Sequence, residues 1–372
     1  LYRDDKEFIE KLDGFAEDYA KKFRGKKLII GNNVKILNTT SIRNVYIGDF
    51  AEVINVLSLK EGTINSSEEA PTIVENGVIA EHFILQRGSS VKESSILEGC
   101  IVGEGTKIGE EFSAKNSVFF ANSEGFHSEA CSVFAGPYTV THHRSTLLIA
   151  GLFSFYNAGS GTNQSNHMYK LGPNHQGILE RGSKTGSFSY LLWPCKIGPF
   201  TAIIGKHYAN FDTSELPFSY IFEDGKFSTI IPGLNFATVG TLRDGDKWPA
   251  RDRRKVSNKL DLIIFDVLSP FTVQKIIRGL EILKRLENEQ TEKDFVLYNG
   301  VTIKKSRIPK AKGYYEVALN KYLGDTLIKR IEEKGEGKEN FNYEEEGSVE
   351  CLKTLLIVLI TFFEISNWFF HL

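Results

Sequence analysis

The sequence has few cysteines and no excess of charge of either sign. Its 372 residues include four cysteines, which lie far apart and form no Cys-x-x-Cys pair. This pattern favours free thiols in a reducing compartment over a disulfide framework, so we expect a cytoplasmic protein. Lys and Arg total 45 against 47 Asp and Glu, for a net charge of −2. That balance gives no reason to expect a nucleic-acid partner.

Several functional motifs are also missing. The chain has no P-loop and no N-terminal Gly-rich strand–loop–helix signature of a sugar nucleotidyltransferase. Its eight histidines show neither H-x-x-x-H nor H-x-H spacing, so we predict no metal site and no tightly bound cofactor. The apolar run 355–363 is short against the ~20 residues of a membrane span, so we predict none. No signal peptide opens the sequence, but it starts at Leu1 and not at methionine, which leaves a preceding segment an open question.

A six-residue repeat is the strongest pattern in the chain. Six of the seven positions reached by steps of six from residue 78 are apolar: Val78, Ile84, Ser90, Ile96, Val102, Ile108 and Ala114. The same step relates Ile47, Val53 and Leu59, and again Leu191, Ile197 and Ile203. This period fits neither a helix nor a single alternating sheet. It predicts stacked coils whose short strands each direct one aliphatic side chain inward, with Ile84, Ile96, Val102 and Ile108 all in the interior. The alternative is an antiparallel β-domain with chance spacing.

The repeat at Ile96–Gly109 resembles the hexapeptide repeats of left-handed parallel β-helix proteins, which include acyltransferases and sugar-nucleotide enzymes. Two further stretches, 158–173 (AGSGTNQSNHMYKLGP) and 191–198 (LLWPCKIG), resemble an uncharacterised bacterial hexapeptide-repeat family over about residues 1–335. The resemblance implies a mainly β fold, a trimeric left-handed parallel β-helix, and no assigned reaction. The aromatic run Phe153, Phe155 and Tyr156 exceeds what a lone coil needs and also favours a homotrimer.

We divide the chain into four parts. Residues 1–27 form an amphipathic helix expected to pack on the coil, and residues 28–250 form the β-helix with a polar insert. Residues 251–349 form a helical appendage, and 350–372 are an atypical apolar tail. In the appendage we expect helices over 259–289, split by Pro270, and over 315–334. Asp224-Gly225 predicts a hairpin turn near the end of the β region.

The polar insert near residues 158–177 carries the main catalytic candidates. Histidine is the side chain best suited to take a proton at neutral pH, and related β-helix acyltransferases use a histidine on the coil surface as a base. We predict His167 as the general base and His175 as the second candidate. The expected substrate-binding residues around them and in a second histidine group are Asn163, Gln164, Asn166, Tyr169, Asn174, His142 and His143. The alternative is an irregular loop whose polar groups satisfy the backbone.

Basic residues near the end of the β region could bind phosphate groups. Arginine offers paired donors that match a phosphate, and the candidates are Lys206, Arg251, Arg253 and Arg254. A solvated helix start explains the arginine run equally well. The resulting hypothesis is acyl transfer from acyl-CoA, as co-substrate, to a sugar or nucleotide-sugar. The alternative is a non-catalytic β-helix scaffold or a sugar-nucleotide-binding module.

Overall fold

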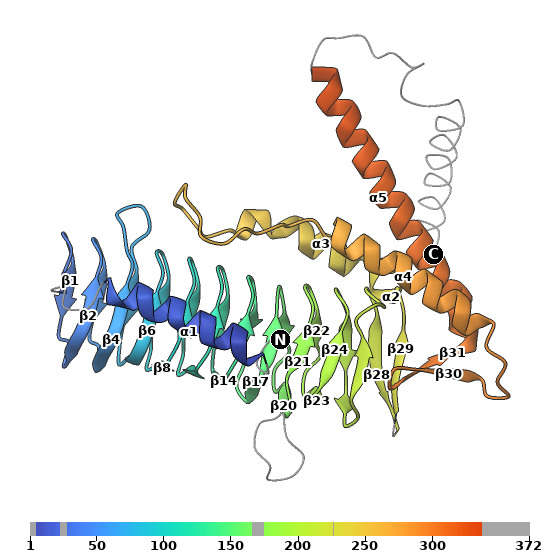
Figure 1. The fold of residues 1–372 in the computed structure, drawn as a ribbon, viewed down its shortest axis with the longest axis horizontal. Coiled ribbons are helices and arrows are strands. Elements are labelled where there is room, and N and C mark those ends of the chain that lie inside the picture. Colours follow the sequence, from blue (N-terminus) through green and yellow to red (C-terminus); the bar gives the residue numbers. More distant parts are fainter. Residues whose placement is uncertain (1–4, 23–27, 166–174, 226, 337–372) are drawn as a thin grey trace.

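The computed structural model describes residues 5–22, 28–165, 175–225 and 227–336. The described β strands wind into the predicted left-handed parallel β-helix, a long prism of stacked coils (Figure 1). An N-terminal helix and several C-terminal helices accompany it. The predicted fold class, a mainly β parallel β-helix with flanking helices, is therefore confirmed.

Each coil contributes one strand to each of the three faces of the prism. Face 1 consists of β1 Lys35–Leu37, β3 Glu52–Ile54, β5 Ile73–Glu75, β7 Ser90–Val91, β10 Lys107–Gly109, β13 Glu124–Phe126, β16 Val140–Thr141, β19 Asn157–Ala158, β22 Lys184–Thr185, β25 Ala202–Ile204 and β28 Tyr220–Asp224. Face 2 consists of β8 Ile96–Glu98, β11 Ser113–Lys115, β14 Ser128–Cys131, β17 Thr146–Ile149, β20 Asn163–Ser165, β23 Tyr190–Leu192 and β26 Lys206–His207. Face 3 consists of β9 Ile101–Val102, β12 Val118–Phe119, β15 Phe134–Ala135, β18 Gly151–Phe153, β21 Gly177–Leu179, β24 Cys195–Ile197 and β27 Phe211–Thr213. In the first coils, faces 2 and 3 share the long strands β2 Ile42–Ile47, β4 Ser58–Ile64 and β6 Ile79–Leu85.

The interior ladder follows a 6-6-5 step and not a uniform six. Ile73 pairs with Ser90 and Ser90 with Lys107, so a coil here takes 17 residues. Seven buried side chains on the strands of this part follow that step: Val74, Ala80, Leu85, Val91, Leu97, Val102 and Ile108. Two of our predictions are therefore wrong, because Ile84 and Ile96 face outward and are 37% and 49% exposed. The ladders at Ile47, Val53, Leu59 and at Leu191, Ile197, Ile203 are buried as predicted.

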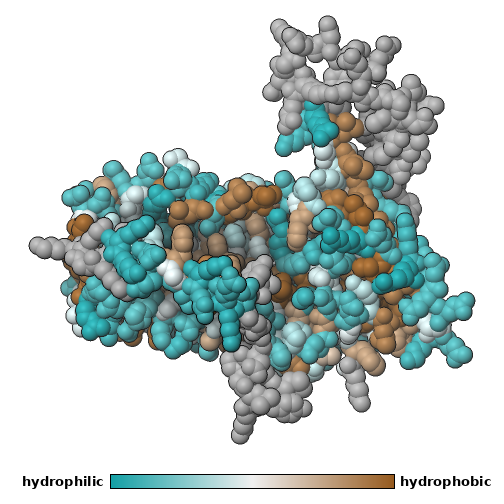
Figure 2. All heavy atoms as spheres, in the orientation of Figure 1, coloured by the Kyte–Doolittle hydropathy of each residue, from teal (hydrophilic) through white to brown (hydrophobic). Residues whose placement is uncertain are grey.

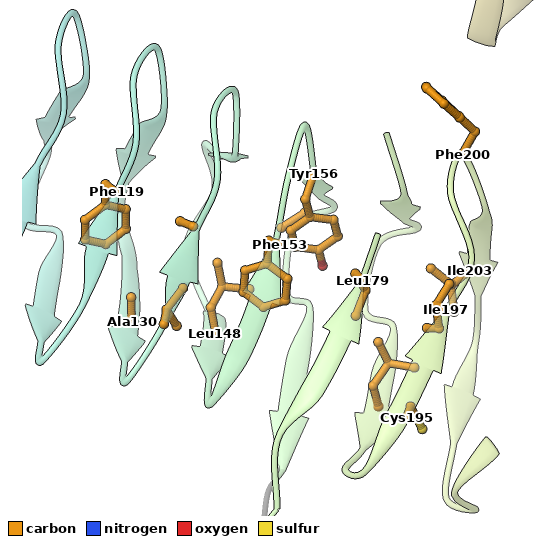
Figure 3. Close-up of a cluster of buried hydrophobic side chains, with 14 of the residues drawn as sticks. Phe119, Ala130, Leu148, Phe153, Tyr156, Leu179, Cys195, Ile197, Phe200 and Ile203 are labelled. Atoms are coloured by element: carbon orange, nitrogen blue, oxygen red, sulfur yellow. The ribbon is translucent and has the colours of Figure 1, made fainter. Parts of the chain in front are cut away.

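Large aromatic side chains, among them Phe153 and Tyr156, help to fill the middle of the coil stack (Figure 3). The rings of Phe153 and Tyr156 stack with centroids 4.8 Å apart. The Tyr156 hydroxyl lies 2.9 Å from the hydroxyl of Thr185, and burial raises the pKa of Tyr156 above its usual value. Phe155 contacts Trp248, with centroids 4.4 Å apart. The three aromatic residues that we connected with a trimer are all buried within their own chain.

The N-terminal helix, α1 Lys6–Lys21, begins at an N-cap, where the Asp5 carboxylate accepts a hydrogen bond from the Phe8 N–H. In Figure 1 the helix runs along the length of the prism, in front of the coils. None of its residues is buried. The predicted helix is confirmed, but the expectation that its apolar side packs on the coil is wrong for this chain alone.

The C-terminal region closes one end of the prism. The predicted hairpin is β28 with β29 Phe227–Ile231, and the helices start soon after it, before the expected boundary at residue 250: α2 Leu234–Ala237, α3 Val239–Lys247 and η1 Pro249–Arg251. They are followed by α4 Pro270–Glu287, β30 Phe295–Tyr298, β31 Val301–Lys304, η2 Lys305–Arg307 and α5 Ile308–Glu336. The long helix expected at 315–334 is confirmed as α5. The Tyr315 hydroxyl donates to the carbonyl of Pro217 at 2.8 Å and joins α5 to the last coil.

Residues 252–269 form an extended segment, here named the strap, and not the helix expected from residue 259. Helix α4 starts at Pro270, behind a capping box formed by Ser269 and Thr272. The strap runs back along the coil corner between faces 3 and 1 (Figure 1). The strap forms hydrogen bonds with the coil. The Leu260 N–H donates to the Glu104 carboxylate, and the Asp261 carboxylate accepts from the Ala121 N–H at 2.7 Å. These long-range bonds replace helical ones, and the local pattern did not reveal them.

Candidate active site on face 1

A glutamate and a histidine from successive coils meet on the outer surface of face 1. Glu124 begins β13 and His142 directly follows β16, and the pairing of Gly125 with Thr141 brings these two strands side by side. Nε2 of His142 lies 2.5 Å from Oε2 of Glu124. The ring of Phe126 lies beside the imidazole, with centroids 5.3 Å apart. The carboxylate and the aromatic ring together fix the orientation of the imidazole.

The strap supplies a cation to the same carboxylate. The Arg253 guanidinium donates from Nη1 to Oε1 of Glu124 at 2.5 Å and from Nε to the carbonyl of Gly105 at 2.7 Å. The backbone N–H of Arg253 donates to Oδ1 of Asn122, whose amide donates to Asp252. Burial alone would raise the pKa of Glu124, but the His142 hydrogen bond and the Arg253 charge outweigh it and lower the pKa below 4.5. Glu124 is therefore a carboxylate anion at neutral pH.

The two nitrogens of His142 have different surroundings. Nε2 faces Glu124, which favours the tautomer with its proton on Nε2 and leaves Nδ1 as an acceptor. The His142 side chain is 46% exposed, whereas Glu124 is 18% exposed. A partly exposed imidazole with a half-buried carboxylate behind it matches the His–Asp part of a hydrolase triad in its chemical roles. The arrangement can accept a proton from a hydroxyl or amine and stabilise the resulting imidazolium.

A second pair of the same type lies one coil earlier. His127 contacts Glu110 through Nε2, and its Nδ1 is buried without a hydrogen-bond partner among the described residues. A buried Nδ1 cannot reach a substrate on the surface. Among the described pairs, His142 with Glu124 therefore has the better geometry for proton transfer.

The residues that we predicted in the polar insert are only partly described. His167, Asn166, Tyr169 and Asn174 lie outside the described residues. His175 is exposed near the end of the insert, and Asn163 is exposed on β20. Gln164 is buried inside the coil, where its Oε1 accepts a hydrogen bond from the Ile149 N–H at 3.0 Å. A ligand on the outer surface has no access to Gln164.

The other predicted residues are distributed over several elements. His143 is exposed next to His142. Lys206 is exposed on β26, and its backbone N–H donates to Glu223. Arg251 is exposed, whereas the Arg254 side chain is 3% exposed and pairs with Asp252 at 2.8 Å. The structure thus brings His142 and Arg253 together through Glu124, and engages Arg253 and Arg254 with carboxylates of the chain itself.

Glu124 and Glu110 were missed by the sequence reasoning. The repeat contained a signal for them, because a coil of about 17 residues places side chains one period apart on neighbouring rungs. Glu110 precedes His127 by 17 residues and Glu124 precedes His142 by 18. The approach of Arg253 had no such signal, since 129 residues separate it from Glu124.

The described residues contain no cluster of three or more His, Cys, Asp or Glu side chains suited to a metal ion. Within the same residues, no helix is both long and apolar enough to cross a membrane. Cys100, Cys131 and Cys195 are free thiols. Burial raises the pKa of Cys195 to about 12, so its thiol is protonated and unreactive.

The coil repeat and the placement of its side chains define a hexapeptide-repeat β-helix protein. Residues 1–287 match the family defined by a domain of unknown function (DUF4954), and the chain belongs to this family. The chain is also similar to the Type II methyltransferase M.MjaI of Methanocaldococcus jannaschii, at 27% identity over 118 residues, or 30% of this chain and 39% of that protein. The chain thus spans about two fifths of the length of that relative. A similar solved structure is Arabidopsis UDP-N-acetylglucosamine acyltransferase, with a TM-score of 0.28, 10% identity and coverage of 69% of this chain and 92% of that chain.

Proposed function

We propose that the protein is a transferase that moves an acyl group from acyl-CoA to a hydroxyl or amine of a sugar or nucleotide-sugar. The observation that carries this proposal is the Glu124–His142 pair, at 2.5 Å on an open face of the coil. An oriented imidazole on a side chain that is 46% exposed has the features of a general base. The resemblance to hexapeptide-repeat acyltransferases supports the choice of reaction.

In the proposed step, Nδ1 of His142 takes the proton of the acceptor while the acceptor oxygen or nitrogen attacks the thioester carbonyl. The C–S bond then breaks, and the CoA thiolate leaves and recovers the proton from the imidazolium. The Glu124 anion stabilises the imidazolium during the interval. Backbone N–H groups at a coil turn would bind the oxyanion of the tetrahedral intermediate.

We prefer His142 to His167 as the base, and His167 and His175 stay as predictions. Phosphate binding by Lys206 and Arg251 also stays a prediction, as do a homotrimer and a cytoplasmic location. The free cysteines support that location, because such thiols persist in a reducing compartment. The rival function is a non-catalytic scaffold or a sugar-nucleotide-binding module.

The test begins with a thermal-shift screen against acyl-CoAs and nucleotide-sugars, followed by assay of free CoA thiol for the pairs that bind. His142→Ala should lower turnover by about 10²–10⁴-fold, the typical effect of losing a general base. Glu124→Gln should also lower it, because the amide neither fixes the tautomer nor stabilises the imidazolium. His82→Ala is the matched control, since His82 is an exposed histidine on β6, outside face 1.

The same assay separates the alternatives. If His167→Ala or His175→Ala abolishes turnover and His142→Ala does not, the base lies in the polar insert. If acyl-CoAs neither bind nor release thiol while nucleotide-sugars raise the melting temperature, the binding-module function is correct and the transferase proposal is wrong.

A further inference from the structure

Face 3 carries a continuous apolar stripe on its outer surface. Register pairs connect, in order, Tyr46, Thr63, Ile84, Ile101, Val118, Phe134, Leu152 and Ile178. Seven of these eight outward side chains are apolar or aromatic, and none belongs to the buried core. The next two rungs place Lys196 and Asp212 at the same position. The stripe therefore ends where charge begins, and it is far longer than scattered surface apolar residues would be.

The stripe remains open to solvent in the single chain. Ile84, Ile101 and Phe134 are 37%, 38% and 48% exposed. Near its N-terminal end lies a groove of about 550 Å³, whose lining includes Leu28, Tyr46, Ile84 and Ile101. A groove of this kind can receive a large apolar side chain from another surface.

Helix α1 carries a row of exposed apolar side chains that includes Leu12 and Phe15, here named the ridge, and this ridge matches the stripe. Its apolar residues recur at three- or four-residue steps, and Leu12 and Phe15 are 50% and 80% exposed. A helix of 16 residues is about 24 Å long. Rungs of a sheet are about 4.8 Å apart, so this length equals about five rungs of the stripe. The helix is joined through residues 23–27 to Leu28, which lines the groove beside the stripe.

We infer that a second copy of this chain covers face 3, and that α1 of one copy lies along the stripe of the other. Within one chain, α1 leaves both its own ridge and its own stripe exposed. Because every copy has one ridge and one stripe, identical copies can satisfy each other in a closed ring. With a helix about 24 Å long and about 10 Å wide, the ridge and the stripe each cover roughly 240 Å², or roughly 480 Å² per copy, against the ~800 Å² per partner of a standard interface. This inference does not depend on the proposed reaction.

The experiment measures molar mass by light scattering across a range of protein concentrations. Ile101→Asp should convert the assembly to monomers, because it places a carboxylate inside the apolar contact. Ile96→Asp is the matched control on face 2, with a similarly exposed isoleucine, and should keep the assembly. The double variant Leu12→Asp/Phe15→Asp should dissociate the assembly as Ile101→Asp does. Circular dichroism and melting temperature confirm that each variant folds.

A cysteine pair identifies which copy supplies the helix. Leu12→Cys with Ile101→Cys should form a disulfide between chains, seen as a covalent oligomer on a non-reducing gel. A disulfide within one chain would overturn the inference, because α1 would then cover its own stripe. A wild-type protein that is monomeric at all concentrations would also overturn it, as would an Ile101→Asp variant with unchanged mass.

Discussion

Faces 1 and 3 share one backbone repeat but differ completely on their outer surfaces. Face 1 carries ion pairs between successive rungs, such as Lys35 with Glu52 at 2.6 Å and Lys92 with Glu75 at 2.9 Å. Face 3 carries the apolar stripe through Ile84 and Ile101. The inward positions of both faces are similar, with Val91 on face 1 and Val102 on face 3 fully buried. Packing inside the coil determines which residues occupy the inward positions, whereas the outward positions can differ from face to face.

Because their outer surfaces differ, faces 1 and 3 suit different functions. A charged surface can join an imidazole, a carboxylate and a guanidinium by hydrogen bonds, as Glu124, His142 and Arg253 show on face 1. An apolar surface of eight rungs is costly to leave in water. We therefore connect face 1 with chemistry and face 3 with assembly, and each prediction below tests one part of this distinction.

The largest effect is expected from placing a charge on the inward side of a coil. Leu97→Asp should lower the free energy of unfolding by several kcal/mol, because Leu97 is 1% exposed and an aspartate there has no partner. Ile96→Asp, at the adjacent outward position, should change it by less than about 0.5 kcal/mol, as surface substitutions usually do. Chemical denaturation measures both. Equal losses would mean that the inward and outward positions are not distinct.

These two neighbours also show how far the sequence could predict the fold. The apolar period was sufficient for the coil, because each rung repeats the same local packing. A uniform step of six nevertheless placed Ile96 inside, since one of the three corners of a 17-residue coil is a residue shorter. The repeat gives no sign of the strap, whose position depends on bonds such as that between Arg253 and Glu124. Likewise the sequence indicated His142 as a candidate, but identifying Glu124 as its partner requires the 17-residue period of the coil.

A smaller effect is expected from detaching the strap from face 1. Arg253→Met should destabilise the protein by about 2–3 kcal/mol, because it removes charge-assisted hydrogen bonds and leaves the mostly buried Glu124 without its cation. Arg251→Met is the matched control, since Arg251 is an exposed arginine at the end of η1, directly before the strap. Hydrogen exchange at the Ala121 amide, which donates to Asp261 of the strap, should accelerate in Arg253→Met alone. An unchanged exchange rate would show that other contacts hold the strap.

The smallest effect concerns the acid limit of stability. The pKa of Glu124 in the folded protein lies below its ordinary value of 4.5, because His142 and Arg253 outweigh the cost of burial. A depressed carboxyl pKa stabilises the fold above the unfolded value, and this contribution is lost as pH falls through the folded value. Glu124→Gln should therefore destabilise the protein by about 1.5 kcal/mol at pH 7, the lower end of the range for a hydrogen bond to a charged group, because the amide keeps part of the hydrogen bonding. As pH falls below 4.5, the gap between wild type and Glu124→Gln should narrow, as followed by urea denaturation from pH 7 to pH 3. Glu111→Gln, on an exposed carboxylate, should run parallel to wild type throughout. A gap between wild type and Glu124→Gln that stays constant across this range would mean that Glu124 acts through packing and not through its charge, and the electrostatic account of the site on face 1 would then be wrong.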